Sequence, residues 1–133
     1  MKSRRHAMAY QNADRQAFAE SDDPHALIAI LFDELLRQMK HFAKEAEGNS
    51  GKNLERSEHY SRALAILYGL QSSLNFEEGG EIANNLFRLY EYSRQQLLNT
   101  TQSENSTGLK SAIESLDVIR DAWHQLGAGA KEK

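Results

Sequence analysis

The sequence predicts an all-α protein, namely an antiparallel four-helix bundle preceded by a short N-terminal arm or cap helix. Apolar residues recur at spacings of three and four along four stretches, and no stretch shows the alternation typical of strands. The connections are short, so consecutive helices should pack side by side in opposite directions. With 133 residues and 40% hydrophobic content, the chain is long enough for one core and too short for two domains.

The first helix has the clearest start signal, which is Asp23 followed by Pro24. Aspartate accepts hydrogen bonds from first-turn amides, and proline at the first helical position loses nothing by lacking an N–H. The helix should end at Gly48, because glycine is common just after the last turn of a helix. Its apolar stripe comprises Leu27, Ile28, Leu31, Phe32, Leu35, Met39, Phe42 and Ala46.

A glycine pair, Gly79 and Gly80, divides two amphipathic blocks within the central stretch 72–98. We interpret the pair as a hinge between the third helix and the second helix, which is expected from near Asn53 to near Leu74. Each block has an apolar stripe that is too narrow to be covered by one neighbour, so further helices must complete the core.

The start of the third helix is left open between Asn75 and Gly80. Asn75 with Glu78 three residues later resembles a capping box, which favours the earlier start. That start places both glycines in the first turn, where their helix propensity is poor. The sequence alone therefore leaves both starts open.

The fourth helix is expected to run from about Ser106 to Leu126, where Gly127 and Gly129 end it. Ahead of the first helix, the chain is polar and alanine-rich, which is typical of a loosely held arm with at most one short helix. The expected organisation is an arm over residues 1–22, a bundle over 23–127 and a flexible tail over 128–133.

Charge and composition exclude several classes of protein. The formal net charge is −3, and residues 1–20 carry four basic and two acidic side chains, which leaves −5 for the remainder and no basic surface for nucleic acid. The absence of cysteine removes disulfides, thiol nucleophiles and cysteine metal sites. The longest apolar run, residues 26–32, is far too short for membrane insertion, and no signal-peptide core follows the basic start. We therefore expect a cytoplasmic protein.

No catalytic, metal or cofactor site is expected. Di-iron bundles place two Glu-x-x-His pairs and two further glutamates inward, whereas this chain offers only Asp121 and His124 at that spacing. Trp123 takes the core direction between them, so the pair should lie along the flank of its helix. The chain also lacks a phosphate-binding glycine motif and a Ser/His/Asp order typical of a triad. The sequence thus predicts a protein that is not an enzyme.

Short motifs are distributed along nearly the whole chain. They are Ala9-Tyr10-Gln11, Pro24-His25, Leu27-Ile28, Leu31-Phe32-Asp33, Ser72-Ser73-Leu74, Phe76-Glu77, Gly79-Gly80-Glu81-Ile82-Ala83, Asn85-Leu86, Leu89-Tyr90, Tyr92 and Arg120-Asp121-Ala122-Trp123. In this order they resemble the FliS family, the flagellin-specific export chaperones of bacteria. Each motif alone is weak, but GGEIA between two apolar stripes, followed by LYxY and RDAW, is hard to reproduce by chance.

The resemblance implies a cytoplasmic chaperone that binds the disordered C-terminal tail of flagellin, in a 1:1 complex. It also implies that the chaperone keeps flagellin from polymerising early and delivers it to the flagellar type III export gate, with other flagellar regulators as further partners. Such a role is physically reasonable, because an unassembled flagellin tail has no partner for its apolar stripe and a bundle with spare apolar grooves can provide one.

The candidate client-binding residues are mostly large apolar side chains that lie off the predicted stripes. On a helical wheel, Ile30 lies roughly opposite the stripe of the first helix, and Val118 lies off that of the fourth. The same holds for Tyr68 and Tyr92 on the second and third helices. The full set is Tyr10, Phe18, Ile30, Tyr68, Leu89, Tyr92 and Val118. The alternative is that scattered exposed apolar groups are normal and need no function.

Two further interpretations stay open. Tyr10 and Phe18 have no stripe of their own to complete, so we expect the arm to fold back over part of the client groove, whereas the alternative is an arm without fixed structure. The chain could also be a structural or dimerising bundle without a flagellin client, in which Tyr68 and Tyr92 form a homodimer seam. A monomer that forms a 1:1 complex with a tail peptide would separate a chaperone from such a dimer.

Overall fold

The computed structural model describes residues 24–48, 53–103 and 105–132, with side chains described as far as Gly127. In chain order the elements are α2 (Pro24–Gly48), the 3-10 helix η1 (Leu54–Arg56), α3 (Glu58–Ser72), α4 (Phe76–Ser103) and α5 (Thr107–Glu132). The described ranges contain no strand, so the predicted all-α, four-helix class is confirmed. The predicted arm, residues 1–22, lies outside the described residues.

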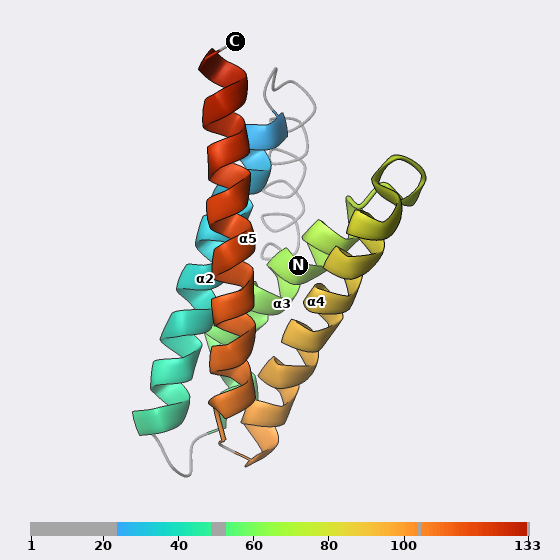
Figure 1. Cartoon of the computed structure of the whole chain (residues 1–133). Coiled ribbons are helices and arrows are strands. Elements are labelled where there is room, and N and C mark those ends of the chain that lie inside the picture. The colour runs from blue at the N-terminus through green and yellow to red at the C-terminus, as the bar shows by residue number, and fades with distance from the viewer. Residues whose placement is uncertain (1–23, 49–52, 104, 133) are drawn as a thin grey trace, which may run out of the picture.

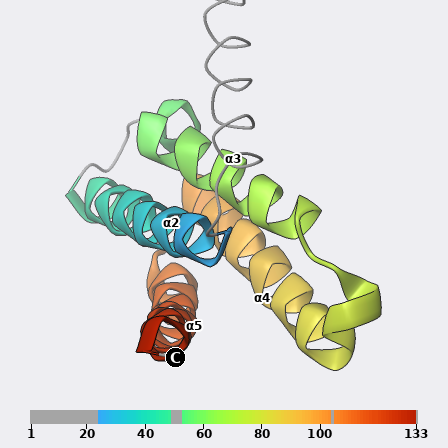
Figure 2. The same ribbon diagram turned by 90° about the horizontal axis from the view of Figure 1, so that it is seen from above.

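The four α-helices form a bundle that is closed at one end and open at the other. Figure 1 shows the chain reversing direction from each helix to the next. α2 and α5 run side by side, whereas α4 leans away from both toward its own start; the view from above in Figure 2 shows the same divergence. α2 packs mainly against α3 and α5, and it has little contact with α4.

The core is built from the predicted apolar stripes. Its largest fully buried side chains include Phe32, Leu35, Met39, Phe42, Leu67, Leu70, Leu97, Leu109 and Leu116. All four α-helices contribute to this one cluster, as expected for stripes that a single neighbour cannot cover. No helix within the described ranges is both long and apolar enough to cross a membrane.

The first two helix starts differ in how well the sequence predicts them. α2 begins at Pro24 and ends at Gly48, as expected. The expected start of the second helix near Asn53 is wrong, because η1 comes first and the chain is extended at Ser57 (φ −62°, ψ 132°). The Ser57 hydroxyl accepts a hydrogen bond from the backbone N–H of Tyr60 at 3.3 Å, which makes Ser57 the N-cap of α3.

The start of α4 combines both sequence interpretations. The helix begins at Phe76, and Asn75 Oδ1 accepts a hydrogen bond from the backbone N–H of Glu78 at 3.0 Å. Four residues into the helix, Gly80 has φ +49° and ψ −123°, a conformation that glycine adopts without a steric penalty. A single capped turn therefore precedes a kink, after which α4 continues to Ser103.

The predicted end of the last helix at Gly127 is wrong. α5 continues through Glu132, so residues 128–132 extend the helix. Gly127 is not in the left-handed region that ends many helices; among the described glycines only Gly80 has positive φ. A Cβ at Gly127 would lie 2.8 Å from Cδ2 of His25, which indicates that this glycine serves close packing against the start of α2.

Candidate functional site

An apolar hollow of about 350 Å³ lies at the open end of the bundle, and we call it the four-helix groove. All four α-helices contribute to it; the divergence of α4 leaves stripe residues of α2, α4 and α5 partly uncovered, whereas Leu70 of α3 is buried. Its apolar lining includes Ile28, Phe32, Leu70, Leu74, Ile82, Leu86, Ile119 and Trp123. Such a surface, formed between helices, can bury the apolar face of a further helix.

The groove has a buried floor and an accessible rim. The floor contains Phe32, which is 1% exposed, and Tyr90, whose ring lies 6.4 Å from that of Phe32. Burial raises the pKa of Tyr90 to about 12, further above physiological pH than the ordinary value, at which the phenol is already neutral. On the rim, Ile82 is 72% exposed although it lines the groove. An exposed isoleucine beside a buried apolar floor is typical of a contact surface rather than a core.

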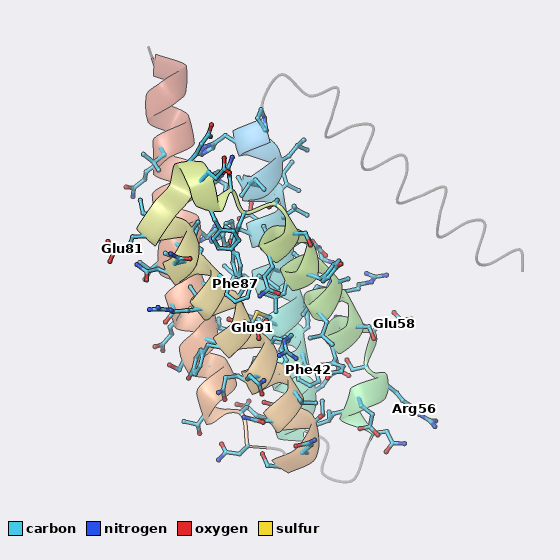
Figure 3. All side chains as sticks on the ribbon, turned by 90° about the vertical axis from the view of Figure 1, so that its right-hand side faces the viewer. Phe42, Arg56, Glu58, Glu81, Phe87 and Glu91 are labelled. Atoms are coloured by element: carbon cyan, nitrogen blue, oxygen red, sulfur yellow. The ribbon has the colours of Figure 1, made fainter. Side chains whose placement is uncertain are left out.

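The kinked start of α4 forms one wall of the groove. Asn75, Glu78 and Gly79 line it, and the edge-to-face rings of Phe76 and Phe87, 6.1 Å apart, connect the first turn to the helix beyond the kink. Figure 3 shows Phe87 on this part of α4. The position of the wall therefore depends on the asparagine cap, the aromatic pair and the backbone conformation of the hinge.

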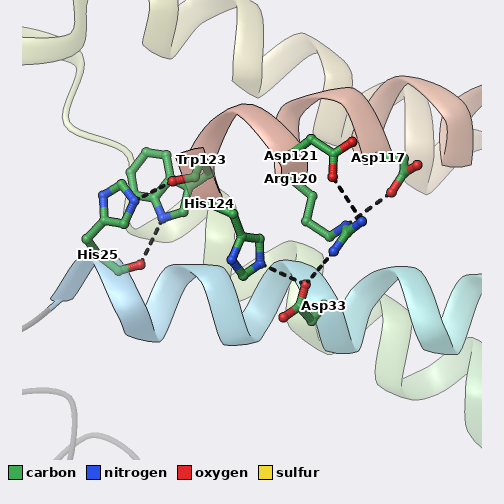
Figure 4. Close-up of polar contacts among 7 residues, drawn as sticks. All are labelled: His25, Asp33, Asp117, Arg120, Asp121, Trp123 and His124. Atoms are coloured by element: carbon green, nitrogen blue, oxygen red, sulfur yellow. Dashed lines mark hydrogen bonds and ion pairs between the residues drawn. The ribbon is translucent and has the colours of Figure 1, made fainter. Parts of the chain in front are cut away.

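The opposite wall is held by contacts between the start of α2 and the end of α5. The rings of His25 and Trp123 are stacked, with centroids 4.1 Å apart and planes 6° apart. Trp123 Nε1–H donates a hydrogen bond to the carbonyl of His25 at 2.8 Å. His25 Nε2 lies 2.6 Å from the carbonyl of Trp123, so this nitrogen carries the proton that it donates. Figure 4 shows both bonds.

A polar cluster further along the same two helices supports this wall. Asp33 Oδ1 lies 3.2 Å from Nη1 of Arg120 and 3.0 Å from Nε2 of His124. Arg120 also contacts the carboxylates of Asp117 and Asp121 at 3.1 and 3.0 Å (Figure 4). Partial desolvation acts to raise the pKa of Asp33, but the hydrogen bonds from His124 and Arg120 outweigh it, and the pKa lies below its ordinary value.

This cluster explains the Asp-x-x-His spacing noted in the sequence. Asp121 and His124 lie on the flank of α5 and face Arg120 and Asp33, as predicted. Within the described residues, no group of three or more histidine, aspartate and glutamate side chains is placed to hold a metal ion. The contact of His124 with Asp33 joins α5 to α2, which gives the histidine of this spacing a structural role.

Comparison with known proteins decides the family. The family model described as "Flagellar protein FliS" matches residues 6–130. The chain belongs to the FliS family. It is 31% identical over 126 residues to the "Flagellar secretion chaperone FliS" of Salmonella typhimurium, covering 92% of this chain and 90% of the relative. It is 26% identical over 118 residues to the protein of the same name in Vibrio cholerae, with coverages of 89% and 85%. The "Flagellar secretion chaperone FliSB" of Pseudomonas aeruginosa is 29% identical over 116 residues, with coverages of 86% and 89%.

Five of the residues predicted to bind a client lie in the described part of the chain, and all but one of them are exposed. Their exposed fractions are 59% for Ile30, 74% for Tyr68, 41% for Tyr92 and 67% for Val118. Leu89 is only half-buried and packs against the core. Tyr10 and Phe18 lie outside the described residues.

The structure does not bring the predicted residues together in the four-helix groove, since none of them lines it. Tyr68 lines a second, smaller hollow of about 260 Å³ between α3 and α4, together with Tyr60, Leu64, Gln71, Arg94 and Leu98. Ile30, Tyr92 and Val118 lie on three different helices. The predicted set is thus spread over the molecule.

Sequence reasoning missed the groove because its lining consists of stripe residues. Ile28, Leu74 and Leu86 have the spacing of core positions, and a helical wheel assigns them to the interior. They remain partly uncovered because α4 diverges from the bundle. The signal that could have found the groove is the glycine pair, since a kink at the start of a helix leaves its neighbours' stripes unfilled.

Proposed function

We propose that this FliS-family protein is a cytoplasmic flagellar export chaperone that binds the disordered C-terminal tail of flagellin, prevents its premature polymerisation and delivers it to the flagellar type III export gate. The names of the three relatives, all flagellar secretion chaperones, support the chaperone role. The four-helix groove supports the binding role, because it exposes contiguous apolar surface on a bundle whose core is otherwise covered.

The single observation that carries the binding proposal is that partly uncovered apolar residues of α2, α4, α5 and the α3–α4 connection gather around one hollow at one end of the bundle. An amphipathic tail can bury its own stripe there only as a helix, because only a helix places apolar side chains at i, i+3 and i+4 on one face. Folding and binding of the tail are then coupled, and one groove per chain gives a 1:1 complex.

The first prediction tests this docking with Ile82→Asp. Ile82 lines the groove yet is mostly exposed, so the change should leave the free energy of unfolding within about 0.5 kcal/mol of wild type. The affinity for a flagellin C-terminal peptide should fall about tenfold, because an apolar contact is replaced by a charge. Calorimetry measures the affinity, and circular dichroism of the mixture should show more helix than the sum of its parts.

The matched control is Ala65→Asp, which adds the same charge at an exposed position of α3 outside both hollows. Its affinity for the peptide should equal that of wild type. Equal loss in both variants would mean that added charge, and not the groove, weakens binding. A constant dimer with no peptide complex, seen by size exclusion, would instead support the alternative of a dimerising bundle with Tyr68 and Tyr92 at its seam.

The exposed residues outside the groove are proposed as secondary client contacts. A long tail can continue from the groove over further surface of the bundle. Tyr68 lines the second hollow and offers the tail an apolar contact between α3 and α4. Ile30, Tyr92 and Val118 are proposed in the same role on their accessibility alone. Leu89 stays in the proposed set, although it packs mainly against the core.

The second prediction concerns residues 1–22, which we propose as a cover of the client groove through Tyr10 and Phe18. α2 begins at Pro24, and Ile28 in its second turn lines the groove, so the arm is joined to the chain close to this surface. Deleting residues 1–19 should strengthen binding of the flagellin peptide about tenfold, since a client no longer competes with a covering segment. Calorimetry on the truncated chain measures this change.

The same experiment separates the alternatives for the arm. Weaker binding by the truncated chain would place the arm inside the client site, and Tyr10→Ala would be the next variant to measure. Unchanged affinity would show that residues 1–19 have no part in binding. All the described lining residues lie at or beyond Ile28, so the deletion removes none of them.

A further inference from the structure

We propose that the four-helix groove selects client segments that carry a lysine or arginine beside the apolar side chain they bury, and that Glu78 is the residue that recognises this charge. The inference rests on the proposed function, because it specifies the chemistry of the segment that the groove accepts. The occupant is a basic amphipathic helix, and the argument is charge complementarity at the groove wall.

The charge on the lining has one sign. Among the described residues that line the groove, Glu78 is the only charged one, and the rest are apolar or neutral. Glu77 and Glu81 are exposed in the same segment of α4 and add to the negative potential. Figure 3 shows Glu81 extending outward there. The ion pairs of the described residues involve other carboxylates, so they leave that of Glu78 available to a partner.

The local structure holds Glu78 at the groove. Its backbone N–H donates to the side chain of Asn75, and the backbone N–H of Gly79 donates to the carbonyl of Asn75 at 2.8 Å. The kink at Gly80 then turns the rest of α4 away from this capped turn. A different start of the helix would move the carboxylate off the wall, so its position follows from a specific backbone conformation.

A purely structural role for the acidic residues gives a different expectation. Negative side chains in the first turn stabilise a helix through its dipole. That role applies equally to Glu77 and Glu78, the two acidic residues of the first turn, whereas only Glu78 lines the groove. Glu77 is therefore a control that shares the helix position and lacks the contact.

The groove combines apolar surface with a carboxylate, which favours lysine and arginine side chains over a cation that has no aliphatic stem. Both side chains lay an aliphatic stem along apolar surface while the charged head stays at the rim. Glu78 is exposed, so an ion pair with a client is a surface ion pair of modest strength that salt screens. Glutamate flanks on a client would instead face a like charge.

The test uses two synthetic amphipathic peptides with the same leucine stripe, one flanked by lysines and the other by glutamates. The wild-type chain should bind the lysine peptide about fivefold more tightly, an advantage that added salt reduces. Glu78→Gln should remove most of the preference and Glu78→Lys should reverse it. Glu77→Gln should keep most of it, and calorimetry on all four proteins measures each affinity.

Equal affinity of the wild type for both peptides would overturn the inference, as would a preference that survives in Glu78→Gln. Binding of the flagellin tail without binding of either synthetic peptide would overturn the inference too. The groove would then recognise a property of the tail that an apolar stripe with flanking charges does not supply. Failure of the flagellin tail to bind, while the lysine peptide binds with the expected preference, would refute the proposed function and leave the inference standing.

Discussion

Phe32→Ala is expected to lower the free energy of unfolding by about 4 kcal/mol. Phe32 is fully buried, belongs to the core cluster and forms the floor of the four-helix groove. Truncation removes the apolar area that the ring buries and leaves a cavity that the surrounding helices cannot close, since the groove already interrupts packing beside it. Urea denaturation followed by circular dichroism measures the change.

The control for this variant is Ile30→Ala, two residues away on α2. Ile30 is mostly exposed, so its truncation should change the free energy of unfolding by about 0.5 kcal/mol or less. A loss below about 1 kcal/mol for Phe32→Ala would contradict the packing described at the open end of the bundle. Because the floor of the groove is lost as well, the alanine variant should also bind the flagellin peptide more weakly.

Replacing both Gly79 and Gly80 by valine is expected to lower the free energy of unfolding by about 3 kcal/mol, on the order of 10 °C in Tm. A side chain at Gly80 is strained at φ +49°, and β-branched residues tolerate that region poorly. A Cβ at Gly79 would lie 2.8 Å from the Cβ of Ala83, closer than two methyl-sized atoms can approach. The two positions are adjacent and share the same backbone turn, so their costs are coupled and the double variant is measured as one unit.

Gly69→Val is the matched control for the glycine pair. Gly69 lies inside α3, and a Cβ there meets nothing within 4 Å. The same chemical change should therefore be neutral or slightly stabilising, because valine has a better helix propensity than glycine. A double valine variant that melts within a degree or two of wild type would show that the pair is only a flexible linker.

The sequence predicts those parts of the fold that depend on local chemistry. Asp23-Pro24 marks the start of α2, and the stripes give the core, because capping and helical periodicity act within a few residues. Ser57 could have been recognised by the same logic, but the preceding residues 53–56, Asn-Leu-Glu-Arg, are compatible with a helix and obscured the break. The predicted start of the second helix is wrong because it gives more weight to a helix-compatible stretch than to the capping serine that follows it.

Two other features depend on contacts that no local pattern contains. α5 passes through Gly127 as a helix because this glycine packs against His25, which is remote in sequence. The four-helix groove depends on the angle at which α4 leaves the bundle, and a helical wheel assumes that every stripe is fully covered. The candidate residues chosen as off-stripe, such as Val118, are accessible, while the groove is lined by stripe residues such as Leu86.

The first and last described helices, α2 and α5, together form one wall of the groove, so this wall is complete only after both have been made. His25 and Trp123 are 98 residues apart in sequence, yet together they fix one wall of the groove. α5 is the last of the described helices to be synthesised, so Ile28 faces an incomplete wall until that helix docks. The surface proposed to bind a client is therefore complete only after α5 has docked against α2.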